Sequence, residues 1–296
     1  MVGGLLLWAG GCWPGPSIEE VDIGVDVRVN AVIAVPHEEL GLFAAVAGGV
    51  IVDGDGRRRQ LSSHELWAIA SDTSGRFWVC GERGYLAFAD VEDSRDETSW
   101  TPVNLGIDAD LFGLAAKGSQ VVVVGDETLW MGSEVDGERQ WIEPTPPSDG
   151  WGQLRAASFV TVNSQEQVIV VGLDGRALVS AADDASFSVA DGLEPGVDYT
   201  RACETLVLGE GLAHARWTGD GWVTGGGGEA ADYVACGRGY VLSSDRWISK
   251  LTDNSKLDRL YRLPWQGWAL DSIFGVYVAG DAGHVALWAE GGPQEF

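Results

Sequence analysis

Three features of the sequence predict an all-β protein, a seven-bladed β-propeller of four-stranded antiparallel blades. A short hairpin pattern recurs along the chain. An apolar run precedes most copies of this pattern, and an aromatic residue follows most of them. No long helical pattern lies between the copies. Because a four-stranded sheet cannot bury both of its faces alone, we expect the blades to stack around a common axis.

The hairpin pattern is clearest in Ser272–Trp288, where two β-rich runs flank a turn with Gly at both ends. Such glycines are typical of hairpins, because Gly adopts backbone angles that other residues resist. The Gly that ends the first run recurs at Gly48, Gly81, Gly125, Gly172, Gly209, Gly237 and Gly280. Successive copies are 28 to 47 residues apart, near the roughly 40–50 residues of a four-stranded blade.

Each blade needs two further strands, and the flanking sequence supplies candidates. The preceding apolar runs are Leu66–Ile69, Leu111–Leu114, Leu154–Ala157, Thr200–Cys203 and Gly267–Leu270. The aromatic residues expected to begin an outer strand are Trp100, Trp141, Phe187, Trp222 and Trp247. Residues 217–232, with the glycine run Gly225–Gly228, lack one strand of the pattern. Blades five and six are therefore predicted to be truncated there, and six blades is the alternative count.

The two ends of the chain are predicted to meet in one blade. The last unit reaches Phe296 without a fourth strand, whereas Val21–Val29 is an alternating strand without a hairpin partner. We expect this N-terminal strand to complete the last blade and remove an open sheet edge. Residues 19–296 then form a single propeller domain, and residues 1–18 are a leader and linker.

The first twelve residues, MVGGLLLWAGGC, resemble the end of a bacterial lipoprotein signal, in which Cys12 becomes the lipidated first residue. The basic start of a secretory signal is missing, and Ala9 stands where such signals usually carry Leu. The apolar run is shorter than the ~20 residues of a membrane span. We expect the cell envelope or periplasm with a lipid anchor at Cys12. The alternatives are a secreted form and a soluble protein with a disordered N-terminus.

The chain is strongly acidic, with a formal net charge of −25. Such a field repels nucleic acid, which is excluded as a partner. Asp53–Gly56, DGDG, has the start of a calcium loop without its later ligands, so no metal and no cofactor are expected. The basic cluster Arg57–Arg59 is interpreted as a charged, solvated strand edge, with contact to an acidic partner as the alternative.

The positions of the cysteines and histidines favour structural roles over catalytic ones. Cys80 and Cys236 both precede a hairpin Gly, about half a ring apart, too far for a disulfide. Cys203 and Cys236 lie in neighbouring units and can pair, but buried free thiols are the favoured interpretation. The histidines His37, His64, His214 and His284 are scattered and form no recognisable catalytic arrangement.

The candidate binding residues lie at the start of the inner strands, where the alignment places Trp67, Phe112, Arg155, Arg201 and Trp268. In a propeller these positions lie near the central channel. Aromatic rings and guanidinium groups around such a mouth can hold an anionic or carbohydrate-like ligand. The alternative is packing between blades, which explains the aromatic residues better than the two arginines.

The repeat resembles the bacterial propellers related to the photosystem II stability/assembly factor and, more distantly, sialidase-type (BNR) repeats. The resemblance is carried by Val79–Gly84 with Trp100, by Val171–Gly175 with Phe187, and by Ala279–Gly283. It implies a scaffold or assembly role outside the cytoplasm. Ser71–Trp78 holds the ingredients of the sialidase-type Asp box at shifted spacing, and the WD-repeat signature, which combines a Gly-His pair with a Trp-Asp pair, is absent.

The leading functional hypothesis is a monomeric, non-catalytic binding or assembly propeller that holds a protein or glycan partner on one rim. The alternative is a carbohydrate-active hydrolase or lyase with its site in the central channel. Glu65 and Asp110, which precede the inner strands of adjacent blades, are then the candidate catalytic carboxylates. A purely structural module in a larger complex is a third possibility.

Overall fold

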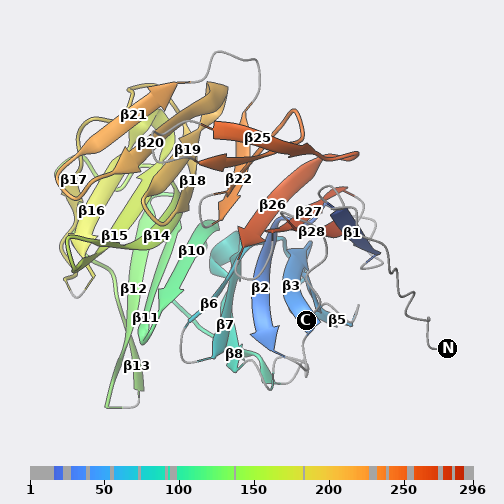
Figure 1. Cartoon of the computed structure of the whole chain (residues 1–296). Helices are drawn as coiled ribbons and strands as arrows, with labels where there is room; N and C mark the ends of the chain where they lie inside the picture. Colours follow the sequence, from blue (N-terminus) through green and yellow to red (C-terminus); the bar gives the residue numbers. More distant parts are fainter. Residues whose placement is uncertain are drawn as a thin grey trace.

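The computed structural model describes residues 17–22, 28–37, 41–53, 57–72, 75–90, 93, 99–136, 138–182, 184–226, 232–237, 240–251, 257–272, 276–281 and 284–289. In these residues the strands form seven four-stranded antiparallel sheets, arranged around an axis (Figure 1). The predicted all-β architecture of four-stranded antiparallel units is confirmed. No helix in the described ranges is long and apolar enough to cross a membrane.

The sheets follow one another along the chain. The first four contain β2 (Ala31–His37), β3 (Gly41–Ala47), β4 (Val50–Asp53) and β5 (Arg58–Gln60); β6 (Leu66–Ser71), β7 (Arg76–Gly81), β8 (Leu86–Asp90) and β9 (Thr101–Pro102); β10 (Leu111–Lys117), β11 (Gln120–Gly125), β12 (Thr128–Val135) and β13 (Glu138–Ile142); and β14 (Leu154–Val162), β15 (Gln165–Gly172), β16 (Ala177–Ala181) and β17 (Ser188–Val189). The last three contain β18 (Tyr199–Cys203), β19 (Leu206–Gly209), β20 (Ala213–Trp217) and β21 (Trp222–Gly226); β22 (Tyr233–Gly237), β23 (Tyr240–Ser243), β24 (Trp247–Leu251) and β25 (Leu257–Arg262); and β26 (Gly267–Ser272), β27 (Val276–Gly280), β28 (His284–Ala289) and β1 (Ser17–Asp22).

The inner strands close a ring. Each of β2, β6, β10, β14, β18, β22 and β26 contacts the next, and β26 contacts β2. The last sheet takes its outer strand from the N-terminal part of the chain, because β1 pairs antiparallel with β28 from Ser17–Ala289 to Asp22–His284. This pairing is the expected one, but the predicted bounds Val21–Val29 were wrong. The strand spans Ser17–Asp22, and residues 28–30 are not in a strand.

The prediction of truncated fifth and sixth blades was wrong. β21 completes the fifth sheet, and β22 is the inner strand of the sixth. The turn after Gly237 therefore joins the first and second strands of its sheet, whereas the turn after Gly81 joins the second and third. The error arose because Gly-rich turns occur in both kinds of hairpin, so the pattern alone does not show which strands a turn connects.

In several sheets the second strand ends at a Gly, and any larger residue there would collide with a neighbouring backbone carbonyl. A Cβ on Gly125 would lie 2.0 Å from the carbonyl oxygen of Asp110, and one on Gly172 would lie 2.1 Å from that of Gln153. Gly172 itself has an extended backbone with φ −158°. The prediction of unusual backbone angles at both glycines of the turn is therefore wrong for this first Gly. It is confirmed for the second, where φ is 69° at Gly84 and 75° at Gly175.

The apolar core lies between neighbouring sheets. One cluster joins Trp78 and Leu86 of the second sheet to Leu111, Val121 and Val123 of the third. Both faces of a middle strand are covered by adjacent sheets, so Val121–Val124 are all fully buried. This explains why the sequence of such strands is continuously apolar instead of alternating.

Asp53 is buried at the start of the loop between β4 and β5. Its side chain is 1% exposed, and its Oδ2 lies 2.9 Å from Nη2 of Arg59, which is 4% exposed. Its Oδ1 accepts the backbone N–H of Arg57 at 3.0 Å. The interpretation of the basic cluster as a solvated edge fits Arg57 and Arg58, which are exposed, but is wrong for Arg59, because the middle residue of β5 faces the interior.

Metal-binding groups are not evident in the described part of the chain. No cluster of three or more His, Cys, Asp or Glu side chains there could hold a metal ion. Of the calcium-loop fragment, Asp53 pairs with arginine, and residues 54–56 lie outside the described ranges. In the shifted Asp-box segment, Asp72 accepts the backbone N–H of Arg76 at 3.0 Å and the indole N–H of Trp78 at 3.2 Å.

Candidate functional site

A β-bulge near the start of most inner strands determines which side chains occupy the candidate site. In six of the seven described inner strands the register shifts after the first paired residue, and the bulged residues are Trp67, Phe112, Arg155, Thr200, Val234 and Trp268. A bulge re-aims the local side chain. The predicted alignment of Arg201 with Trp67 was therefore wrong by one residue. Thr200 occupies that column, and Arg201 occupies a column of small residues that includes Ala68 and Gly113.

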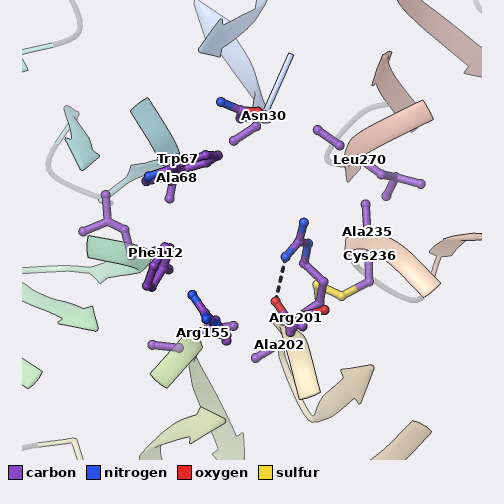
Figure 2. A pocket seen from close by; sticks show the side chains of 18 of the residues that line it. Asn30, Trp67, Ala68, Phe112, Arg155, Arg201, Ala202, Ala235, Cys236 and Leu270 are labelled. Carbon is purple, nitrogen blue, oxygen red and sulfur yellow. Dashed lines mark hydrogen bonds between the residues drawn. A yellow bond between two sulfur atoms is a disulfide. The ribbon is translucent and has the colours of Figure 1, made fainter. Parts of the chain in front are cut away.

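These strand starts surround a cavity of about 340 Å³ at one end of the central channel. Figure 2 shows most of the side chains that line it. Four of the five predicted binding residues, Trp67, Phe112, Arg155 and Arg201, are among them. The side chain of the fifth, Trp268, lies outside the described part of the structure. We refer to this cavity as the arginine mouth.

Arg28 and Asn30 also line the arginine mouth, although the sequence analysis did not identify them. Asn30 directly precedes the first inner strand, which starts at Ala31, and Arg28 lies two residues before Asn30. The missed signal for Asn30 was a position shared with Glu65 and Asp110, immediately before an inner strand. Asn30 is buried and donates to Oε1 of Glu65 at 2.5 Å and to the carbonyl oxygen of Leu66 at 2.7 Å.

One wall of the arginine mouth is aromatic. The ring centroids of Trp67 and Phe112 are 6.3 Å apart, with planes inclined by 47°. The guanidinium carbon of Arg155 lies 4.0 Å from the centroid of Phe112, a cation–π distance. The indole N–H of Trp67 is buried and has no hydrogen-bond acceptor among the described residues.

Arg201 extends towards the open middle of the ring of labelled side chains in Figure 2. Its Nε donates to the carbonyl oxygen of Val234 at 2.8 Å, and its Nη1 donates to that of Thr200 at 2.8 Å. Both acceptors are uncharged backbone groups. Desolvation, with the nearby charge of Arg28, lowers the pKa of Arg201 to about 10, so the guanidinium is still charged at neutral pH.

A disulfide forms part of the opposite wall. Cys203 at the end of β18 is bonded to Cys236 on β22, with their Cα atoms 6.0 Å apart, and both residues line the arginine mouth. The favoured interpretation of free thiols was wrong for this pair. Cys80, on β7, is buried and free, and burial raises the pKa of its thiol. Cys80 and Cys236 occupy different strands of their sheets, so the predicted shared column was also wrong.

A second cavity, of about 530 Å³, lies at the far ends of the inner strands, where Lys117 and Glu204 are among its lining residues. The two cavities share the lining residues Val32, Leu114, Ala157, Cys203, Cys236 and Leu270. This shared ring is mostly apolar and separates an end rich in arginine from an end of mixed charge. The chemistry of the two ends of the channel therefore differs.

Comparison with known proteins gives the fold. A solved structure of the WD40 repeats of RRP9 superposes with a TM-score of 0.68, covering 93% of this chain and 98% of that chain at 12% sequence identity. The protein is a β-propeller. At this identity the likeness concerns the fold alone. No protein-family model matches the sequence, and no curated protein matches it.

The two candidate catalytic carboxylates do not line either end of the propeller channel. Oδ1 of Asp110 accepts the backbone N–H of Arg83 at 3.0 Å, across the boundary between two blades. The corresponding contacts elsewhere in the ring are Asp198 with Asp174 at 3.0 Å and Asp232 with Gly211 at 2.8 Å. Asp110 thus belongs to a repeated column that ties one blade to a turn of the preceding blade. Glu65 is engaged by Asn30.

The described histidine side chains lie away from the arginine mouth. His214 on β20 is buried and packs edge-on against Tyr233, with ring centroids 6.0 Å apart. Burial raises the pKa of Tyr233 to about 12. His64 has its Nδ1 3.8 Å from Oε2 of Glu82 at a partly exposed site. The side chains of His37 and His284 lie outside the described part of the structure.

Proposed function

We propose that this chain is a non-catalytic binding propeller that holds its partner, a protein or a glycan, at the arginine mouth. The observation that carries the proposal is the composition of that mouth. Three arginines, Arg28, Arg155 and Arg201, line it beside an aromatic wall, and no described carboxylate does so in a chain of net charge −25. A propeller fold, which is typical of interaction scaffolds, is consistent with this role.

The test is a double substitution, Arg155→Ala with Arg201→Ala, in the full propeller. Loss of charge-assisted hydrogen bonds costs about 1.5–3 kcal/mol for each bond. We therefore expect affinity for the partner, measured by calorimetry or on a glycan array, to fall at least about tenfold. Arg216→Ala, at an exposed position on β20 outside the mouth, is the matched control and should bind normally. Unchanged binding by the double variant would place the binding face elsewhere.

The proposed location is the cell envelope or periplasm, with a lipid anchor at Cys12. The lipoprotein-like leader supports this location, and so does the disulfide between Cys203 and Cys236, because such bonds persist mainly in oxidising compartments. Residues 1–16 lie outside the described ranges. On expression of the full chain in a bacterium, the wild type should partition into a detergent phase and Cys12→Ser into the aqueous phase. Aqueous partitioning of the wild type would contradict the anchor.

The same proposal includes a monomeric state, no binding to nucleic acid, and the assembly role implied by the resemblance to photosystem II stability/assembly factor propellers. The alternative of a carbohydrate-active hydrolase or lyase gains no comparable support. Its two candidate carboxylates, Glu65 and Asp110, do not line the channel cavities, and they accept hydrogen bonds from Asn30 and from the backbone of Arg83.

A further inference from the structure

The arginine mouth has features that narrow the chemistry of its ligand. Building on the function proposed above, we infer that this mouth binds the carboxylate group of a small organic anion whose body is a planar ring. The ring-bearing acid can be a free molecule or the C-terminal residue of a peptide. Three features support this inference: the remaining N–H donors of Arg201, the aromatic wall and the charge of the whole chain.

Arg201 provides the donors for the carboxylate. A guanidinium has five N–H groups, and the two hydrogen bonds of Arg201 use its Nε and one N–H of Nη1. The remaining N–H groups belong to a side chain that reaches into the cavity (Figure 2). A carboxylate accepts two parallel N–H groups from one guanidinium, which makes this pair stronger and more selective than a neutral hydrogen bond.

Charge compensation favours the same ligand group. The two acceptors of Arg201 are backbone carbonyls, and the next charge acting on it is that of Arg28, another cation. Keeping a guanidinium in a desolvated position without a counter-charge is costly. The lowered pKa of Arg201 reflects that cost. A bound carboxylate supplies the negative charge that the described lining of the mouth lacks.

The aromatic wall provides the place for a ring. Arg155 already covers Phe112, whereas the ring of Trp67 is partly exposed in the cavity lining. A planar ligand can stack against that ring. The cavity volume of about 340 Å³ falls at the lower end of the ~300–1,000 Å³ typical of small-molecule sites.

The charge of the whole chain restricts how negative the ligand is. At a net charge of −25 the propeller repels anions at long range, and the repulsion grows with the charge of the ligand. Every charge of a polyanion is repelled by this field. A monocarboxylate has a single repelled charge, and the arginines of the mouth then attract it. The mouth is therefore suited to an anion of low total charge.

The experiment is calorimetric titration of the full chain with five matched probes. Phenylacetate and phenylacetamide differ only in the charged group, and acetate lacks the ring. A short neutral peptide ending in Phe with a free carboxylate represents the peptide source, and its C-terminal amide is the control. We expect each carboxylate probe with a ring to bind at least tenfold more tightly than its amide. Acetate should bind less tightly than phenylacetate. Tighter binding of phenylacetate than of the peptide acid indicates a free molecule, and the reverse indicates a chain end.

Two substitutions assign the effect to the mouth. Arg201→Gln should weaken phenylacetate binding at least tenfold, and Trp67→Leu should reduce the advantage of phenylacetate over acetate. Arg216→Gln is the control with the same chemical change outside the cavity. Circular dichroism melting of each variant identifies any loss of fold. If Arg201→Gln does not fold, Arg201→Lys keeps the charge but removes the paired donors, and it should also weaken phenylacetate binding.

Equal affinity for acid and amide, or no binding of any carboxylate probe at millimolar concentration, would overturn the inference. The outcome is distinguishable from failure of the proposed function. If the partner needs Arg155 and Arg201 while no carboxylate probe binds, the ligand chemistry is wrong and the binding face is right. If the probes bind while the double alanine variant still holds its partner, the carboxylate site stands and the partner-binding face is wrong.

Discussion

Arg59→Ala is expected to lower the free energy of unfolding by about 3–5 kcal/mol, because it removes the guanidinium that pairs with a buried carboxylate. Asp53 and Arg59 are 1% and 4% exposed, and their side chains meet at 2.9 Å. Removing the guanidinium leaves Asp53 in contact with the backbone N–H of Arg57. Urea unfolding at neutral pH, followed by tryptophan fluorescence, measures the change.

Two further variants make this prediction specific. Arg58→Ala, at the preceding exposed position of β5, should change stability by no more than about 0.5 kcal/mol. Asp53→Asn with Arg59→Met removes both charges and should recover much of the loss, since a buried ion pair is often replaceable by uncharged groups of similar volume. A loss below about 1 kcal/mol in Arg59→Ala would show that the ion pair does not stabilise this loop.

Removal of the disulfide is expected to cost about 3–4 kcal/mol. The two cysteines are 33 positions apart, and a cross-link over a loop of this length reduces the entropy of the unfolded chain by about that amount. It also joins β18 to β22, the inner strands of two neighbouring blades. The double variant Cys203→Ser, Cys236→Ser should therefore unfold at a lower urea concentration than the wild type.

Reductant provides the internal control for the disulfide. Dithiothreitol should shift the unfolding curve of the wild type towards that of the double variant and leave the double variant unchanged. Alkylation of the denatured wild type should label Cys203 and Cys236 only after reduction. Labelling of both residues without reduction would contradict the bond, and a reductant-insensitive wild type with the bond present would contradict its energetic role.

Local sequence patterns predicted much of the fold. The recurring hairpin, with Gly125 and Gly172 at equivalent points, follows from short-range sequence and identified the repeated sheets. The sequence pattern did not predict which strands the turn after Gly237 connects in the sixth sheet. Gly237 ends an inner strand, whereas Gly125 ends a second strand. The space requirement at Gly125 involves the carbonyl of Asp110, a contact that is visible only once the strands are paired.

The candidate site was predicted in part for the same reason. Trp67, Phe112 and Arg155 were located correctly by their position at the start of inner strands. The one-residue shift at Arg201 arises from a bulge, which the linear spacing does not reveal. The pairing of Cys203 with Cys236 depends on the separation of two strands across a blade boundary. Burial of Arg59 depends on which face of β5 it occupies, and three consecutive arginines do not indicate that.

The pairing of β1 with β28 affects how the molecule unfolds. In an open array of repeats, terminal units have only one neighbour and can detach one after another. Here every inner strand has a neighbour on both sides, and the last sheet is completed by a strand from the opposite end of the chain. No blade can separate without breaking contacts on two sides. Unfolding should therefore be cooperative, because each blade is stabilised by its contacts with both neighbouring blades.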